Sequence, residues 1–219
     1  MITLYGVYRS RATRPIWLLY ELGLDFTHVP VTQGYRLADP LAPDAPLNTL
    51  SPEFRKINPQ GQVPALTEDG VTLTESLAIC LHLARRHGGA VGPADWREDA
   101  LMTNWALFAA TAIEGTAIGI LYTYMDKAQD TDEGRAKIAT AVEGLQRPLA
   151  RLESHLAAQD WLVGDRFTVA DLMVAECLRY AALHKPLLDP FPKVAAWLAR
   201  CQARPAFQKM FAGRNAEPA

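Results

Sequence analysis

The stretch NPQGQVPALTEDGVTLTES, residues 58–76, decides the fold class of this 219-residue chain. Its two short apolar runs, VPALT and VTLT, are separated by Glu-Asp-Gly, which is typical of the tight turn of an antiparallel hairpin. Pro64 lacks a backbone donor, so it fits a sheet edge, or a cis bond that presents the backbone of Val63 to a ligand. Glu75 and Ser76 then open a helix, where free N–H groups and the helix dipole favour an anion such as a carboxylate.

The residues on either side of this hairpin complete an α/β domain. Upstream, the β-rich run ITLYGVY, the helical pattern PIWLLYELG closed by Gly23, and the run DFTHVPV predict β, α and β. Downstream, ESLAICLHLARRH predicts a helix that ends at Gly88. The predicted order over residues 1–87 is βαβ followed by ββα, the element order of a thioredoxin-like sheet.

A second domain, over residues 95–219, follows a Gly- and Pro-rich linker at residues 88–94. Asp95 begins a long apolar helix that runs to about Met125, and the next helix has an apolar stripe with alternating spacings of four and three residues. TVAD at residues 168–171 has the spacing of a capping box. With no strand pattern beyond the linker, the sequence predicts an all-α helical bundle.

Composition excludes several classes of function. The chain is 49% hydrophobic and 21% charged with a net charge of −2, which is typical of a globular protein and unsuited to neutralising nucleic-acid phosphates. We find no apolar run that approaches the ~20 residues of a membrane-spanning helix, and no signal-peptide pattern. The three cysteines are widely spaced without a CxxC or Cys/His cluster, which indicates reduced thiols and no metal site. We therefore expect a cytoplasmic protein that binds neither nucleic acid nor membrane.

The sequence resembles the glutathione transferase family. The resemblance rests on NPQGQVPAL, on the DG and ES that follow it at the family spacing, on LYG near the start, on a helix ending in ELGL, and on WLVGDRFTVADLMVAE. It supports the thioredoxin-like assembly of residues 1–87 as a glutathione-binding domain and implies that the helical domain lines the electrophile site. It further implies a cytosolic homodimer of the serine type, similar to theta and beta members, with a role in detoxification.

The resemblance also implies which residues bind glutathione. The backbone of Val63, beside a cis Pro64, pairs with the cysteinyl part, and Glu75 and Ser76 hold the γ-glutamyl end. Gln62 stands where many relatives carry Lys, which leaves a neutral hydrogen bond in place of a charged contact to the glycine carboxylate.

Aligning IWLLYELG with the first helix of the family puts Ser10 where a Tyr, Ser or Cys donates a hydrogen bond to the sulfur of glutathione. Lowering a thiol pKa from ~8.5 by about two units corresponds to roughly 2.7 kcal/mol of thiolate stabilisation. The hydroxyl, the helix N-terminus and Arg9, Arg11 or Arg14 together are suited to supply it. Tyr8 is the competing donor, and a lone Ser before a helix is more often only an N-cap.

Candidates for the electrophile site are Tyr8, Arg11, Trp105, Phe108, Tyr122 and Met125. Aromatic side chains at helical spacing are usually core, so we expect about two of them, from the end nearest Tyr122 and Met125, to line a pocket. The long loop at residues 32–50 is a lid over the glutathione site, a subunit contact or a tolerated surface insertion.

The predicted reaction is attack of the glutathione thiolate on an apolar carbon electrophile, with glutathione as co-substrate. Two alternatives stay open. One is a non-catalytic glutathione-binding protein of the same fold, and the other is a specialised catabolic enzyme such as a dehalogenase or an ether-cleaving enzyme.

Overall fold

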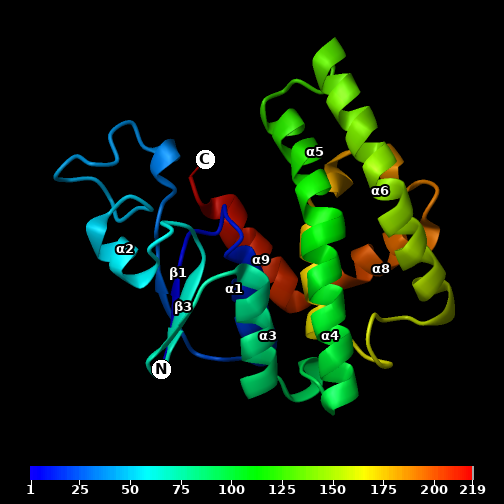
Figure 1. The fold of residues 1–219 in the computed structure, drawn as a ribbon, viewed down its shortest axis with the longest axis horizontal. Helices are drawn as coiled ribbons and strands as arrows, with labels where there is room; N and C mark the ends of the chain where they lie inside the picture. The colour runs from blue at the N-terminus through cyan, green and yellow to red at the C-terminus, as the bar shows by residue number, and fades with distance from the viewer. Residues whose placement is uncertain (219) are drawn as a thin grey trace. The chain divides into compact units, whose positions relative to one another are not determined.

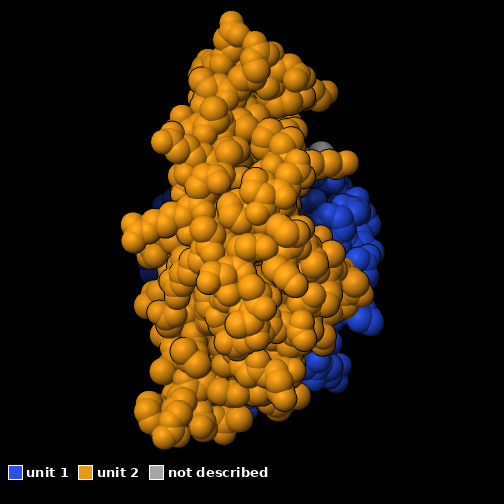
Figure 2. Space-filling model, turned by 90° about the vertical axis from the view of Figure 1, so that its right-hand side faces the viewer, with its two compact units in different colours: residues 1–87, 205–219 blue, residues 88–204 orange. Residues whose placement is uncertain are grey.

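The computed structural model describes residues 1–218, which form two compact units (Figure 1). Unit 1, blue in Figure 2, comprises Met1–His87 together with the segment that starts at Pro205. Unit 2, orange in Figure 2, comprises Gly88–Arg204. The sequence analysis placed residues 1–87 in one domain and residues 95–219 in another, whereas the structure groups the segment from Pro205 with Met1–His87.

A four-stranded mixed sheet forms the centre of unit 1. Its strands, in spatial order, are β2 (Thr27–Val29), β1 (Ile2–Tyr5), β3 (Ala65–Glu68) and β4 (Val71–Leu73). β1 runs parallel to β2 and antiparallel to β3, which is antiparallel to β4. The predicted βαβ–ββα order of a thioredoxin-like domain is confirmed, and the turn between β3 and β4 is the Asp69-Gly70 step, with both residues at positive φ.

Four helices accompany the sheet of unit 1: α1 (Thr13–Leu22), α2 (Pro52–Ile57), α3 (Ser76–His87) and α9 (Pro205–Ala216). α9, red in Figure 1, packs against α1. The rings of Trp17 and Phe207 meet edge to face with centroids 5.0 Å apart, and both side chains are buried. This aromatic contact is the physical reason why the C-terminal segment belongs to unit 1.

Unit 2 is all-helical, as predicted, with α4 (Trp96–Phe108), α5 (Gly115–Met125), α6 (Asp132–Ala158), α7 (Val169–Leu178) and α8 (Pro192–Gln202). A π-helical segment, Ala109–Glu114, joins α4 to α5, so the helical backbone continues from Trp96 to Met125. By length and composition this run passes the test for a membrane span, which the sequence analysis did not expect. The core helix of a globular protein can have the same length and composition. In this run, 39% of the apolar 18-residue stretch is buried.

Every residue of α7 is buried, and its N-terminus is held by the predicted capping box. The side chain of Asp171 accepts hydrogen bonds from the backbone N–H groups of Thr168 and Leu162, at 2.9 and 3.0 Å. It also accepts from the indole N–H of Trp197 at 2.9 Å, which ties α7 to α8. A buried carboxylate with several donors therefore organises the core of unit 2.

Arg166 links the segment before α7 to the start of α4. Its guanidinium donates to both carboxylate oxygens of Glu98, at 2.9 and 2.6 Å, and to the carbonyl oxygens of Ala90 and Gly92. Glu98 also accepts from the backbone N–H of Ala94 at 2.8 Å. The hydrogen bonds from Arg166 outweigh the effect of burial and lower the pKa of Glu98 to about 2.

Glu98→Gln is expected to reduce the free energy of unfolding at pH 7 by on the order of 1–2 kcal/mol, a value discounted for partial exposure of the pair. Because the folded-state pKa is depressed, this stabilisation is present above the unfolded value near ~4.3 and is lost as the pH falls toward about 2. Urea unfolding at neutral pH and at about pH 3 measures it, and the difference between wild type and variant should shrink at the lower pH. Glu143→Gln, at an exposed position of α6, is the control, and an equal loss there would contradict the assignment.

Candidate active site

Ser10 lies in the loop that connects β1 to α1. Gly6 opens this loop at φ 142°, and a Cβ on it would lie 3.0 Å from the Cβ of Ala12 and 3.3 Å from that of Val63. The half-buried hydroxyl of Ser10 donates to the carbonyl oxygen of Val7 at 2.6 Å and accepts from the N–H of Ala12 at 3.0 Å. The hydroxyl thus lies just ahead of the first turn of α1, with its hydrogen directed at the Val7 carbonyl.

Tyr8, the competing donor, has other partners. Its hydroxyl lies 2.7 Å from that of Tyr20, and its ring meets His28 edge to face at a centroid distance of 5.3 Å. Burial, and then the hydrogen bond with Tyr20, raise the pKa of the Tyr8 phenol. The ring also lies against α9, where a Cβ on Gly213 would come within 2.8 Å of it. These contacts favour a packing role for Tyr8 over thiol activation.

The residues expected to pair with the cysteinyl part of glutathione lie at the start of β3. The Val63–Pro64 peptide bond is cis, as the resemblance implied. Pro64 is buried, Val63 is half-buried, and Gln62 is exposed. The side chain of Asn58 donates to the carbonyl oxygen of Gln62 at 2.7 Å and so holds the approach to the strand. The Gln62 side chain is therefore available at the surface for the expected neutral hydrogen bond.

Glu75 and Ser76 lie at the N-terminus of α3. Glu75 is exposed and has a left-handed φ of 58°, a conformation that is uncommon outside glycine and that binding sites often retain. The hydroxyl of Ser76, 5% exposed, accepts a hydrogen bond of 2.8 Å from the guanidinium of Arg14. The sequence groups Arg14 with Arg9 and Arg11 around the thiol, whereas the structure buries Arg14 against Ser76. A buried cation thus supports the predicted γ-glutamyl site.

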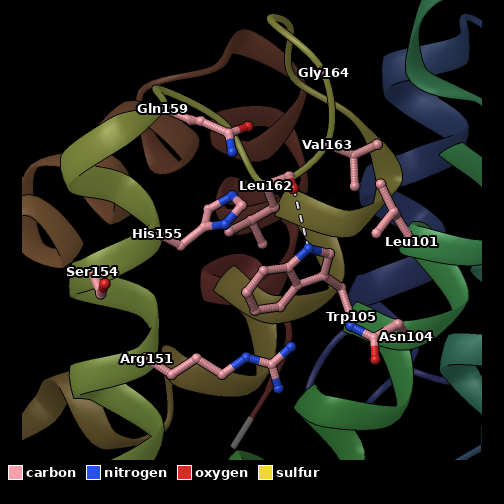
Figure 3. A pocket seen from close by; sticks show the side chains of 10 residues that line it. All are labelled: Leu101, Asn104, Trp105, Arg151, Ser154, His155, Gln159, Leu162, Val163 and Gly164. Carbon is pink, nitrogen blue, oxygen red and sulfur yellow. Dashed lines mark hydrogen bonds between the residues drawn. The ribbon is translucent and has the colours of Figure 1, made fainter.

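Arg11, an electrophile-site candidate in unit 1, has an exposed side chain. The candidates of unit 2 lie in two separate places. Trp105 and Phe108 on α4 meet edge to face at 5.3 Å, and the guanidinium of Arg151 on α6 lies 4.7 and 4.3 Å from their ring centroids. The indole N–H of Trp105 donates to the carbonyl of Leu162 at 3.1 Å (Figure 3). Trp105 also lines a hollow of about 460 Å³ between α4, α6 and the segment that contains Leu162 (Figure 3).

The other two candidates lie on α5. Tyr122 and Met125 are 51% and 58% exposed, and Tyr122 lines a separate hollow of about 250 Å³ beside the turn from α5 to α6. Helical spacing grouped all four side chains, but Trp105 is 4% exposed and packs inside unit 2 while the α5 pair faces outward. The α5 pair is therefore the more accessible of these candidates, and its contact with a ligand stays a prediction.

The loop at residues 32–50 reaches the loop that carries Ser10. Asn48 stabilises the conformation of this loop. Its side chain is 1% exposed and donates to two backbone carbonyl oxygens within the same segment. A single 3-10 turn, Gly34–Arg36, then places two side chains on the carbonyl oxygen of Arg9. Gln33 donates to it at 3.1 Å and Arg36 at 3.0 Å.

One residue of this region was missed in the sequence. The carboxylate of Glu217 accepts hydrogen bonds from the backbone N–H groups of Tyr8 and Arg9, at 2.9 and 2.7 Å. The partners are 209 and 208 residues apart, so no local spacing could have indicated the contact.

The cysteines of the chain stay outside this arrangement. Cys80, Cys177 and Cys201 are all buried and form no disulfide. Within residues 1–218, no group of three or more His, Cys, Asp or Glu side chains is placed to hold a metal ion. Cys80 is buried within α3.

Comparisons with known proteins agree with this geometry. The family model of the glutathione S-transferase N-terminal domain matches residues 4–91, and that of the C-terminal domain matches residues 108–205. A glutathione S-transferase from Hyoscyamus muticus is 32% identical over an alignment of 217 positions. The alignment covers 94% of this chain and 95% of the relative. This chain belongs to the glutathione S-transferase family.

Solved structures of related transferases have the same fold. Glutathione transferase F7 from Populus trichocarpa superposes with a TM-score of 0.81 at 29% identity, over 98% of this chain and 100% of that one. The theta class glutathione S-transferase from Xanthomonas axonopodis pv. citri, solved with glutathione bound, gives a TM-score of 0.74 at 27% identity over 95% of each chain. The thioredoxin-like unit and the helical unit of this transferase are thus those of its family.

Tyr8→Phe is expected to leave kcat of the transferase within about twofold of wild type, because the ring keeps its packing and only the bond to Tyr20 is lost. Loss of that hydrogen bond should lower the free energy of unfolding by about 1 kcal/mol. Steady-state kinetics and urea unfolding measure the two effects. A tenfold loss of kcat in a stable variant would instead make Tyr8 the thiol donor.

Ser76→Ala is expected to weaken glutathione binding by about 10- to 100-fold, because a hydrogen bond to a charged group contributes ~1.5–3 kcal/mol and each 1.4 kcal/mol is a factor of ten. Calorimetric titration with glutathione measures it. Since the change also removes an acceptor of Arg14, urea unfolding accompanies the titration, and Ser76→Thr should keep most of the affinity. Wild-type affinity in Ser76→Ala would contradict the γ-glutamyl assignment.

Proposed function

We propose that this transferase activates the thiol of glutathione with the hydroxyl of Ser10 and directs the thiolate onto an apolar carbon electrophile. The observation that carries the proposal is the placement of that hydroxyl ahead of α1, held by the Val7 carbonyl and the Ala12 N–H. The position of the oxygen is fixed before the ligand arrives, so only the O–H must rotate from the Val7 carbonyl toward the sulfur when charge develops there.

The chemistry divides into deprotonation and attack. The thiol proton leaves to solvent, and the thiolate accepts a hydrogen bond from Ser10 while the positive end of the α1 dipole favours its charge. The sulfur lone pair then forms the bond to carbon, and the leaving group departs with the bonding electrons. Lowering the thiol pKa by about two units, worth roughly 2.7 kcal/mol, makes most of the bound ligand a thiolate at neutral pH.

Glutathione binds along the edge formed by the start of β3 and the N-terminus of α3. The backbone of Val63 pairs with the cysteinyl part, Gln62 offers its amide to the glycine end, and Glu75 and Ser76 take the γ-glutamyl end. The buried guanidinium of Arg14 supports this last contact, because it holds the Ser76 hydroxyl in place and adds positive charge near a carboxylate. Tyr122 and Met125, exposed on α5, contribute to the electrophile site.

The same proposal includes assembly and location. The enzyme acts as a homodimer in the cytoplasm, as its family resemblance implies, with no nucleic-acid or membrane partner. Light scattering at micromolar concentration distinguishes a dimer from a monomer of 24.1 kDa.

Ser10→Ala is expected to lower kcat by about 10²- to 10³-fold, the usual effect of losing one donor to a developing anion. The pKa of bound glutathione should rise toward ~8.5. Thiolate absorbance across pH and turnover of a chlorodinitrobenzene measure the two effects, and Thr140→Ala, at an exposed position of α6 outside both hollows, is the control. If both quantities stay at wild-type values, Ser10 only caps the loop. If wild-type enzyme binds glutathione with an ordinary thiol pKa, the protein binds without activating it.

A further inference from the structure

The backbone of Arg9, the residue before Ser10, is held at both its N–H and its carbonyl oxygen. The N–H of Arg9 donates to one carboxylate oxygen of Glu217 at 2.7 Å, and the adjacent N–H of Tyr8 donates to the other at 2.9 Å. On the opposite side, the carbonyl oxygen of Arg9 accepts from Gln33 at 3.1 Å and from Arg36 at 3.0 Å. Segments from both ends of the chain thus converge on one residue of the β1–α1 loop.

The approach of Glu217 follows from the packing of α9. Gly213 lies against the ring of Tyr8, where an added Cβ would come within 2.8 Å, so α9 passes close to the loop. The N–H of Glu217 donates to the carbonyl of Gly213 at 3.1 Å, which continues the last turn of the helix. The guanidinium of Arg9 in turn donates to the carbonyl oxygen of Glu217 at 2.9 Å. Glu217 therefore meets the loop with its side chain and its backbone.

We propose that Glu217 is a positioning residue for the reaction: its carboxylate holds the Tyr8–Arg9 backbone and thereby sets where the Ser10 hydroxyl points. This inference rests on the proposed function of Ser10. Two neighbouring N–H groups that share one carboxylate form charge-assisted hydrogen bonds, which are shorter and stronger than neutral ones. The β1–α1 loop starts at a glycine and has no regular secondary structure, so its conformation depends on such hydrogen bonds.

Positioning and charge predict opposite effects on the ligand. A carboxylate near the thiol disfavours the thiolate, so its removal would lower the bound thiol pKa if charge were all that mattered. If Glu217 instead positions the donor, its removal loosens the loop, weakens the bond from Ser10, and raises that pKa. A catalytic donor must be held within about 0.5 Å of its productive position. Loss of the hydrogen bonds to Glu217 should therefore reduce turnover.

The test compares Glu217→Ala and Glu217→Gln with wild type, and Glu143→Ala on α6 serves as the control for an equal change of charge. We expect Glu217→Ala to lower kcat about tenfold and to raise the bound thiol pKa by about one unit, while KM for glutathione changes less than twofold. Glu217→Gln keeps one acceptor oxygen and should fall between Ala and wild type. Arg36→Ala removes a hydrogen bond to the same residue, Arg9, so its effect should not simply add to that of Glu217→Ala.

Amide exchange across residues 6–12 completes the test and is independent of activity. Faster exchange in Glu217→Ala together with the higher thiol pKa supports the proposal. A lower or unchanged thiol pKa, or kcat at the wild-type value, overturns it. If wild-type protein binds no glutathione, the proposed function of Ser10 fails. Amide exchange then decides separately whether Glu217 holds the loop. Equal exchange rates in Glu217→Ala and wild type would show that it does not.

Discussion

The pairing of β1 on both of its edges is the constraint on which the site depends. Parallel bonds to β2 and antiparallel bonds to β3 leave the strand no freedom, and the register places Tyr5 opposite Ala65. The residue after Tyr5 opens the Ser10 loop, and the residue before Ala65 belongs to the cis Val63–Pro64 step. The Ser10 loop and the Val63–Pro64 step therefore arise at matching ends of two neighbouring strands.

Features that one local pattern encodes were predictable. Alternating apolar residues with Asp-Gly between them indicated the β3–β4 hairpin, and Thr168 with Asp171 indicated the start of α7, because turns and caps depend on residues a few positions apart. Ser10 needed more, since its hydroxyl does bond to its own loop, as an ordinary cap would. Only the family resemblance of the flanking segments proposes it as the thiol donor, and that role stays a prediction.

Features that depend on distant pairs were not predictable. Arg14 was grouped with Arg9 and Arg11 as one of three cations near the thiol, yet it is 1% exposed and donates to Ser76. Trp105 shared an apolar helical pattern with Tyr122, and it is the packing of α6 and of the segment with Leu162 that buries Trp105. A helical pattern states which side chains share a face, but it does not state which neighbour covers that face.

The contact between α9 and α1 has a consequence for how the protein is made. Trp17 lies near the start of the chain, and the ring that covers it, Phe207, lies near its end. Synthesis from the N-terminus therefore produces the whole sheet of unit 1 and all of unit 2 before the last helix of unit 1 exists. On the ribosome the helical unit has its full sequence first, and the glutathione-binding unit keeps an uncovered apolar face until residues 205–216 emerge.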